Sequence, residues 1–345
     1  MSEARQGIAD TLEPSPLTFV FLDGWSVNTG RVSGMVDAML RDGFRLLDAQ
    51  YKGLSEADAE EIYRENHPIR EGNSWHVARL VYPMGRSLGL LLAHPEARCA
   101  CERMRRLKGR ANPALQALGQ LRHAFLAPNR ILSLMHSSDD LRQTYREGSV
   151  FFSHERIDRA LLAAQKREQS AGVFDLVAGH DALGLERLQE PGLGELFAKV
   201  RLRLVDELRP RLERVQTLAA ALGVYRDVWV DAAKPAPRQH ALLEARAYLR
   251  LVLLETEKLN SLLSALDNER PWARESAHFY RNDWHESERV VQSLWILNRP
   301  SAYSTWDSVR QLPPSILYDR WESLLFRAYL FNFDDLMVSP EANLP

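Results

Sequence analysis

Short apolar runs alternate with amphipathic stretches along residues 17–153. The run from Leu17 to Leu22 is closed by Asp23-Gly24, which predicts a buried strand followed by a turn. The same reasoning predicts further strands at 44–49, 87–93 and 131–135. Apolar residues at helical spacing, with capping or stop residues at the ends, predict helices at 30–42, 55–63, 75–82, 96–108 and 138–146. The predicted order is therefore β-α-β-α-α-β-α-β-α.

This order is typical of a sheet layered with helices, and its register resembles a ferredoxin-like β-α-β-β-α-β unit with additions. After residue 153 the pattern becomes helical. Residues 193–222 predict one long amphipathic helix with a kink near Pro210. We read 226–238 as a linker and 242–266 as a central, buried helix, because the latter is apolar on more than one face. Further helices are predicted at 271–280, 284–298 and 315–333.

The domain organisation follows from these patterns. We predict a flexible arm at 1–16, an α+β ferredoxin-like domain at 17–153 and an all-α domain at 154–345. A length of 345 residues agrees with about two domains.

Composition limits which partners and which compartment we expect for this protein. The 44 basic and 46 acidic residues give a net charge of −2, so we expect no nucleic-acid partner. No apolar stretch approaches the roughly 20 residues of a membrane span, and the N-terminus leads into no apolar signal, so we expect no membrane contact and a cytoplasmic location. Cys99 and Cys101 are one residue apart and are expected to be reduced thiols.

Side chains that suit phosphate chemistry gather in the first domain. His136 lies where a short predicted strand ends and a helix begins, with helix N-terminal amides nearby to bind anions. Glu147 lies near the end of that helix and can reach back to orient the imidazole. Arg105 and Arg122 lie upstream, and the guanidinium fork matches phosphate oxygens.

These residues are part of an ordered series of motifs: Phe21 to Gly24, Gly30 to Met35, Gly43 to Leu46, Tyr63, Arg105 to Ala114, Arg122, His136 to Asp140, and Glu147. The series resembles the nucleoside diphosphate kinase family. The family's motifs read K-P-D-G, G-x-[VI]-G-x-[IV], G-F-x-[LIV], a helix-end Tyr, R-x-x-x-G-x-T-N-P-A, an Arg, H-G-S-D-S and a Glu. The resemblance runs from about Leu17 to Phe152, under half of the chain.

The resemblance implies a nucleoside diphosphate kinase-type domain and a two-step phosphoryl transfer through a phosphohistidine. It implies three catalytic residues, His136, Glu147 and Ser138, and three phosphate-binding residues, Arg105, Arg122 and Tyr63. Glu147 would hold the imidazole in one tautomer and Ser138 would support this pair. Mg²⁺ would bridge the nucleotide phosphates, and no side chain is assigned as a metal ligand. The implied partner is a nucleotide or another phosphorylated small molecule, and a homodimer is possible.

Several positions depart from the family pattern. Phe21 stands where the family has its phosphate-binding lysine, and Ala111 stands where it has threonine. Ser133 takes the place of an asparagine, unless a shifted loop lets Asn129 serve. The segment between Arg122 and His136 is one residue longer than the pattern. Lys108, Arg110 or Arg130 could compensate for the lost lysine. The expected nucleotide-binding residues are Trp75, as a base-stacking ring, with Asn112, Arg110 and Arg130.

The pattern keeps the nucleophile and its supports while the surrounding phosphate contacts are reduced. Our leading hypothesis is a divergent nucleoside diphosphate kinase-like phosphotransferase whose helical domain narrows substrate choice or covers the site. The alternatives are a nucleotide-sensing regulatory protein with a degenerate site, a scaffold, or an altered site that carries out phosphate-ester or nucleotidyl chemistry.

Overall fold

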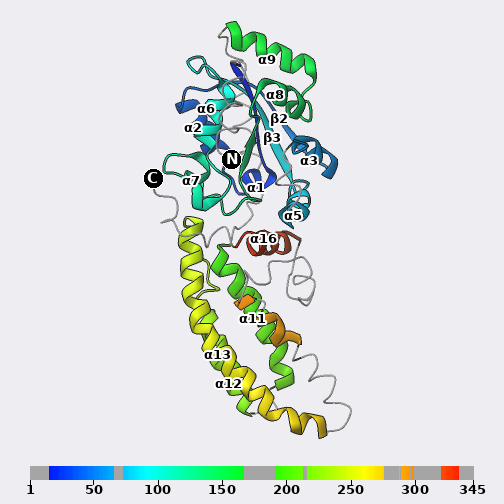
Figure 1. Cartoon of the computed structure of the whole chain (residues 1–345), viewed down its shortest axis with the longest axis vertical. Helices are drawn as coiled ribbons and strands as arrows, with labels where there is room; N and C mark the ends of the chain where they lie inside the picture. Colours follow the sequence, from blue (N-terminus) through cyan, green and yellow to red (C-terminus); the bar gives the residue numbers. More distant parts are fainter. Residues whose placement is uncertain are drawn as a thin grey trace, which may run out of the picture. The chain divides into compact units, whose positions relative to one another are not determined.

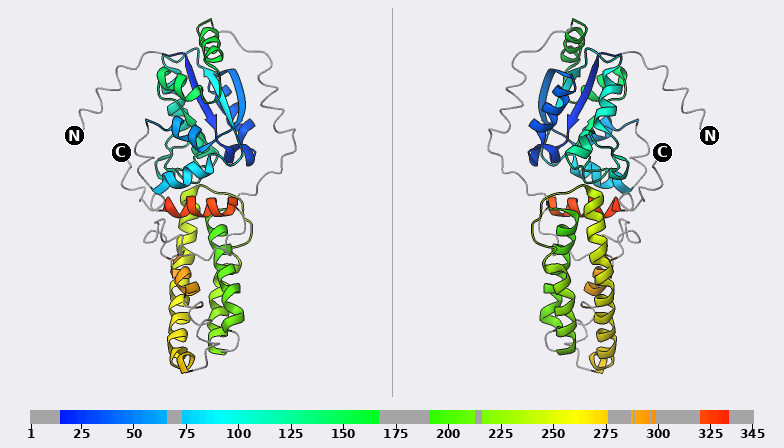
Figure 2. Two further views of the ribbon diagram at one scale, coloured as in Figure 1. Left: turned by 90° about the vertical axis from the view of Figure 1, so that its right-hand side faces the viewer. Right: turned by 90° about the vertical axis from the view of Figure 1, so that its left-hand side faces the viewer.

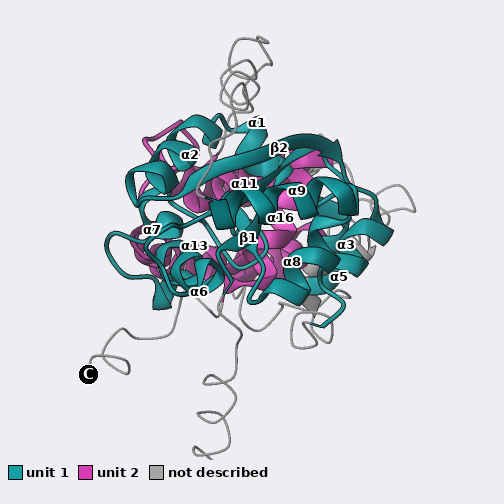
Figure 3. Ribbon diagram, turned by 90° about the horizontal axis from the view of Figure 1, so that it is seen from above, with its two compact units in different colours: residues 1–190 teal, residues 191–345 magenta. Residues whose placement is uncertain are grey.

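The computed structural model describes residues 15–65, 73–166, 191–212, 216–275, 287, 289–295, 297–298 and 320–333. Contacts within the chain divide it into two compact units, Met1–Glu190 and Pro191–Pro345, which Figure 3 shows in different colours. We call them unit 1 and unit 2 and describe each by itself. In the described part of the chain, no helix combines the length and the apolar character needed to cross a membrane.

Unit 1 is built on a four-stranded antiparallel sheet (Figure 1). The strands are β1 (Leu17–Leu22), β2 (Arg45–Gly53), β3 (Arg86–Ala93) and β4 (Met135–Ser137), in the order β2-β3-β1-β4. This order and direction confirm the predicted α+β ferredoxin-like fold. Every residue of β1 is buried, as expected for a central strand covered on both faces.

The helices of unit 1 follow the predicted sequence of elements. They are α1 (Gly24–Asn28), α2 (Val32–Arg41), α3 (Glu56–Ile62), α5 (Asn73–Val81), α6 (Ala100–Lys108), the 3-10 helix η3 (Pro113–Leu115), α7 (Leu121–Ala124), α8 (Leu141–Gly148) and α9 (His154–Lys166). The predicted capping box of α3 is present, because Ser55 and Asp58 each accept from the other's backbone amide. The Asp140 carboxylate caps α8 by accepting from the Gln143 amide.

The candidate histidine belongs to a row of residues that are paired across three strands of the sheet. His136 pairs with Phe21 on β1, and Phe21 pairs with Gly89 on β3. A side chain at position 89 would collide with Phe151, because a Cβ there would lie only 2.6 Å from the ring. The Phe151 ring therefore occupies the space above Gly89 and stacks on Phe21 with 6.0 Å between centroids. Because Gly89 has no side chain, the Phe151 ring can pack against Phe21 on β1, the strand that is paired with His136.

The fourth strand begins later than the sequence predicts. Ile131, Leu132 and Leu134 are apolar and buried, as in a strand, but residues 131–134 form an irregular segment, and β4 starts only at Met135. Asn129 accepts through Oδ1 from the amides of Ile131 and Leu132, which replaces strand pairing there. Leu134 adopts a positive φ of 71° just before the strand.

The boundary of unit 1 also differs from the prediction at residue 153. Helix α9 lies within unit 1 and contacts α8 and strands β1, β2 and β3. Arg156 on α9 makes a bidentate ion pair with Asp48 on β2, with 2.8 and 2.6 Å between donor and acceptor atoms. The polar, charged sequence of α9 hid this packing, because only Ile157, Ala160 and Ala164 face inward.

The described residues of unit 2 are mainly helical, as predicted; residues 231–240, between two of its helices, are not helical. Helices α11 (Leu193–Leu212), α12 (Gln216–Val230) and α13 (Ala241–Glu275) lie side by side (Figures 1 and 2), and α16 (Arg320–Phe331) contacts α11. Residues 289–295 are also helical, within the range predicted at 284–298. The predicted arm at 1–16 lies almost wholly outside the described residues.

Three details of the helical prediction need correction. The single helix expected at 193–222 consists of two, α11 and α12, and Pro210 lies within the last turn of α11. Helix α12 extends to Val230, into the expected linker. Helix α13 is not buried on all sides, since Leu253 is 74% exposed and Leu254 is 59% exposed. Only the part of the predicted helix at 271–280 that falls in α13 lies within the described residues.

The centre of unit 2 holds a buried ion pair. Arg201 on α11 and Glu255 on α13 are both fully buried, with Nε 2.6 Å from Oε1 and Nη2 3.0 Å from Oε2. Tyr225 donates to Oε1 of Glu255, and Asn298 donates to Oε2 over 2.8 Å. The guanidinium lies 4.0 Å above the ring of Trp229. Every polar atom of the pair is therefore hydrogen-bonded, as burial of charge requires.

We expect Glu255→Ala to destabilise unit 2 by about 3–5 kcal/mol, because it leaves the Arg201 charge buried and unpaired. Denaturant unfolding of the full chain, followed by the fluorescence of Trp229, measures this. Asp231→Ala, which breaks an exposed ion pair with Lys234, is the matched control and should leave the curve unchanged. Equal behaviour of the two variants would contradict the role assigned to the buried pair.

Candidate functional site

The site is centred on a carboxylate that supports a histidine. Nε2 of His136 lies 2.8 Å from Oε2 of Glu147, and Oγ of Ser138 donates to the same oxygen over 3.1 Å. The Glu147 side chain is 2% exposed and that of His136 is 15% exposed. Since a carboxylate accepts, Nε2 carries the proton and Nδ1 carries the lone pair. Nδ1 has no hydrogen bond to any residue in the described part of the chain.

Arg146 completes this arrangement and was not among the predicted site residues. Nη2 donates to Oε1 of Glu147 over 3.0 Å, so both carboxylate oxygens are occupied. Nη1 donates to the carbonyl oxygens of Glu61 and Ile62 at the end of α3. Tyr63 is the next residue and caps that helix. Arg146 therefore ties the support of His136 to the helix end that positions Tyr63. In the sequence, only its position next to Glu147 could have indicated this role.

Aromatic rings surround the imidazole. Phe21 lies 5.6 Å from the His136 ring and Tyr63 lies 5.0 Å from it, measured between centroids. Tyr82 stacks on Tyr63, and Trp75 meets Tyr63 edge-on. Phe21 is almost completely buried. The position at which the resemblance implies a lysine is thus part of an apolar wall beside His136.

The hydroxyl of Tyr63 is engaged with a neighbour. It lies 2.7 Å from the hydroxyl of Tyr82, and either group can be the donor. Burial raises the pKa of both phenols, so both stay protonated at neutral pH. In a pair of two hydroxyls, one proton makes the shared bond and the other stays available. The pair can still donate one hydrogen bond to an anion at His136.

Arg122 holds the backbone around the site. It is 7% exposed, and its guanidinium donates to the carbonyl oxygens of Gly109, Ser133 and Met135 and to the hydroxyl of Ser133. Burial lowers its pKa to about 10, so the group remains charged at neutral pH. Four of its five donors are used in this way. A contact with phosphate stays a prediction, and the geometry gives Arg122 a structural task as well.

The other predicted residues lie in different settings. Arg105 and Arg110 are exposed and form no ion pair with any residue that the structure describes, and Arg130 is also exposed. Asn112 is buried and caps η3 by accepting from the Ala114 amide. Trp75 is buried against Tyr63 and presents no open face for a base. Trp75 and Asn112 therefore contribute packing and capping, and their nucleotide contacts stay predictions.

A buried lysine lies on the opposite face of β4. Nζ of Lys108 is 2.7 Å from Oγ of Ser137, the residue after His136. Burial, with the charge of Arg122, lowers the pKa of Lys108 to about 7. Ser137 stands where the family motif has glycine.

Two residues were expected near the position of the family's asparagine. Ser133 accepts a hydrogen bond from Arg122, and Asn129 accepts from the backbone before β4, so neither side chain is seen in the role of that asparagine.

Asp23, the carboxylate of the turn after β1, is also buried close to the site. Its Oδ1 accepts from the amide and the hydroxyl of Ser26, while Oδ2 has no partner within the residues described. Burial raises the pKa of this carboxyl.

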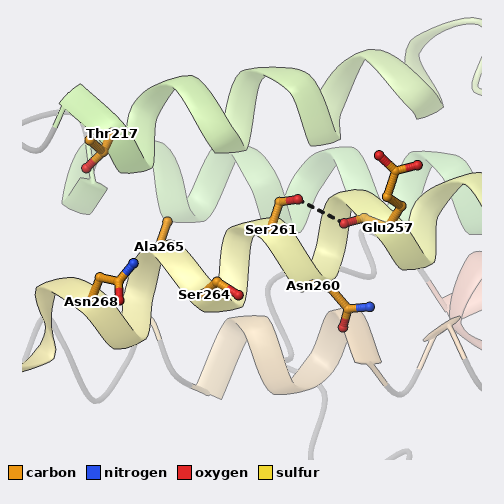
Figure 4. A pocket seen from close by; sticks show the side chains of 7 residues that line it. All are labelled: Thr217, Glu257, Asn260, Ser261, Ser264, Ala265 and Asn268. Atoms are coloured by element: carbon orange, nitrogen blue, oxygen red, sulfur yellow. Dashed lines mark hydrogen bonds between the residues drawn. The ribbon is translucent and has the colours of Figure 1, made fainter.

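Unit 2 has a separate open groove of about 650 Å³ on α12 and α13. Figure 4 shows its short polar side chains, with Ser261 donating to the carbonyl of Glu257 over 3.0 Å. None of the predicted site residues lies in it. No group of three or more metal-ligating side chains was found within the described ranges of either unit.

Fold and site together define unit 1 as an α+β domain with a four-stranded antiparallel sheet and a carboxylate-supported histidine. The family model for nucleoside diphosphate kinase matches residues 17–157, so the N-terminal part of the chain is a nucleoside diphosphate kinase-like domain. No curated protein sequence matches the chain.

Solved nucleoside diphosphate kinase structures are similar to the same part. That of Encephalitozoon cuniculi is 15% identical with a TM-score of 0.37. A family protein from Babesia bovis is 18% identical with a TM-score of 0.36. A halophilic enzyme from Halobacterium salinarum, in complex with CDP, is 20% identical with a TM-score of 0.37. Each comparison covers 41% of this chain and 90% of the other.

We expect Arg122→Met to lower the stability of unit 1 by about 2–4 kcal/mol, because it strands buried carbonyl oxygens without donors. Arg105→Met, at an exposed arginine, is the control and should leave stability unchanged. Calorimetric unfolding of both full-length variants measures the difference. A stable Arg122→Met protein that fails only in anion binding would show that Arg122 is a phosphate ligand without the structural task.

Proposed function

We propose that this protein is a divergent nucleoside diphosphate kinase-like phosphotransferase that acts on a nucleotide or another phosphorylated substrate through His136. The observation that carries the proposal is the contact of 2.8 Å between Nε2 of His136 and the buried carboxylate of Glu147. It leaves the Nδ1 lone pair as the nucleophile and compensates the positive charge that the ring acquires when a bond forms there.

The chemistry has two balanced steps. The Nδ1 lone pair forms a bond to the terminal phosphorus of a nucleoside triphosphate while the bridging P–O bond breaks and the nucleoside diphosphate leaves with the electron pair. An acceptor oxygen then takes the phosphoryl group and regenerates the imidazole. Arg105 and the Tyr63–Tyr82 pair would supply charge and a hydrogen bond to the phosphoryl oxygens. Mg²⁺ carried by the nucleotide phosphates would neutralise part of their charge.

The remaining sequence expectations are part of this proposal. The partner is a nucleotide or another small phosphorylated molecule, with no nucleic acid and no membrane. The protein acts in the cytoplasm as a monomer or homodimer, and its cofactor is the Mg²⁺ carried by the nucleotide phosphates. Cys99 and Cys101 are both free thiols, in keeping with a reducing compartment.

Incubation with γ-labelled ATP and Mg²⁺ should give an acid-labile label on the full chain. His136→Ala should abolish the label. Glu147→Gln keeps the hydrogen bond but removes the charge, and should slow labelling by about 100-fold. His123→Ala is the matched control, because that histidine lies on α7 and is only partly buried. Absence of an acid-labile label, or a label that persists in His136→Ala, would exclude the phosphohistidine.

A nucleotide sensor is the second candidate, and a specific observation favours it. Phe21 packs against His136, and Arg122 donates to backbone carbonyls, so two positions that the resemblance assigns to phosphate contacts are occupied by packing and backbone support. Such a site can bind a nucleotide while it transfers slowly.

Titration calorimetry with a panel of nucleoside di- and triphosphates distinguishes these functions. The transferase should bind and also turn over, releasing nucleoside diphosphate. Binding without any product after prolonged incubation would establish the sensor instead. Mass spectrometry of the products identifies phosphate-ester or nucleotidyl chemistry, which would give free phosphate or pyrophosphate. Absence of both binding and turnover would leave a scaffold.

A further inference from the structure

Helix α13 carries one repeating pattern on two opposite sides. Its buried positions follow one another at alternate spacings of four and three residues, at 241, 245, 248, 252, 255, 259, 262 and 266. This is the spacing of helices that pack side by side as in a coiled coil, here against α11 and α12. The exposed positions between 243 and 264 follow the same seven-residue period, so they stay in line along the helix. We call this continuous exposed surface the α13 face.

The two halves of the α13 face differ in size and charge. The first half carries mostly long apolar or basic side chains: Leu243, Arg246, Ala247, Arg250, Leu253 and Leu254. The second half begins with a carboxylate and continues with short polar side chains, and its residues line the open groove of about 650 Å³ (Figure 4): Glu257, Asn260, Ser261 and Ser264. The first half therefore protrudes, while the second half is recessed.

Two adjacent leucines lie where the halves meet. Leu253 is 74% exposed, Leu254 is 59% exposed, and Leu243 in the first half is 51% exposed. A single exposed leucine is ordinary on a protein surface. Several on one side of one helix form an apolar patch, which favours a surface that another molecule covers.

The charged residues of the α13 face have few partners within the chain. Arg246 and Arg250 form no ion pair with any residue in the described ranges. Glu257 is 76% exposed, and within the same ranges its ion pair is with the adjacent Lys258, over 2.9 Å. An exposed pair of this kind contributes little, so the carboxylate can accept a second cation. The leucines are thus flanked by a basic group on one side and an acidic group on the other.

We propose that the α13 face binds the same face of a second copy of this chain, with the two helices antiparallel and a two-fold axis between Leu253 and Leu254. Such an axis places positions at equal distances on either side of it opposite one another. Arg250 lies four positions before Leu254, and Glu257 lies four positions after Leu253. Both are therefore about 5 Å from the axis along the helix, at a rise of about 1.5 Å per residue. Arg250 of each copy meets Glu257 of the other.

The same axis makes the rest of the face complementary to itself. Leu253 and Leu254 of both copies form a cluster of four leucines at the centre, between the two ion pairs. Leu243 in the protruding half lies level with Ser264 in the recessed half of the second copy. A parallel pair would instead place Arg250 beside Arg250 and Glu257 beside Glu257, and like charges disfavour it. Charge and shape therefore both select the antiparallel direction.

This inference goes beyond the proposed function and does not depend on it, because no residue of unit 1 takes part. The interface consists of one helix from each copy, which is small for a protein interface, so we expect a weak dimer that forms as the protein concentration rises.

Sedimentation velocity of the full chain over a range of concentrations tests the apolar centre. The parent chain should show a monomer–dimer equilibrium, and Leu254→Asp should weaken the dimer by about 30-fold or more, because it places a charge among the central leucines. Leu162→Asp is the matched control, since Leu162 on α9 is 54% exposed and lies outside the α13 face. It should leave the dissociation constant unchanged.

A charge exchange tests the direction of the pair. Arg250→Glu and Glu257→Arg should each be monomeric where the parent chain is a dimer, because like charges then face each other twice. An equimolar mixture of these two variants should form a heterodimer. The double variant should dimerise again, since opposite charges meet once more in the antiparallel pair but not in a parallel one. Arg159→Glu, at an exposed arginine of α9, is the control and should behave as the parent chain does.

Circular dichroism of each variant checks that it is folded, and the exposed positions of these residues make loss of folding unexpected. A parent chain that stays monomeric at high micromolar concentration would overturn the inference. So would a dimer that Leu254→Asp weakens no more than Leu162→Asp does, or a double variant that stays monomeric.

Discussion

The carboxylate of Glu147 organises the first unit around its site. One oxygen receives His136 and Ser138, and the other receives Arg146, which continues to the carbonyl end of α3. Because every one of these bonds is short and the carboxylate is buried, the imidazole has one tautomer and one orientation. The strand of His136, helix α8 and the tyrosine after α3 are therefore positioned by a single group. Loss of this carboxylate would first disturb the fold of the site. Any effect on a substrate would follow from that change.

The side chains around that imidazole are mostly aromatic and apolar. Less water reaches it than would reach a site lined by several exposed cations. Phe21 and Tyr63 contact the ring, Phe151 fills the space above Gly89, and the tyrosines bond to each other. Apolar walls strengthen each remaining electrostatic interaction, since water cannot screen it.

Much of unit 1 could be predicted because its signals are local. The apolar run of β1, the capping box at Ser55 and the motif residues each report their own structure. The predictions that were wrong share one cause: they depend on side-chain hydrogen bonds and ion pairs that the pattern of apolar and polar residues does not encode. Asn129 bonds to the backbone where an apolar run favoured a strand, and Arg156 attaches α9 to β2 from a sequence that reads as a solvated helix. The motif singled out Arg122, but only the structure gives the backbone carbonyls that it binds.

Buried cations distinguish the two units. Arg201 in unit 2 has a carboxylate in bidentate contact, the hydroxyl of Tyr248 and the face of Trp229, so its charge is compensated within the fold. Lys108 and Arg122 in unit 1 are also buried, with 8% and 7% exposed, yet their contacts within the described residues are hydroxyl and carbonyl oxygens, which carry no formal charge. Desolvating a basic group without a counterion is costly, so these oxygens have to satisfy its donors. The two units therefore hold buried basic groups by different means, an ion pair in unit 2 and neutral oxygens in unit 1.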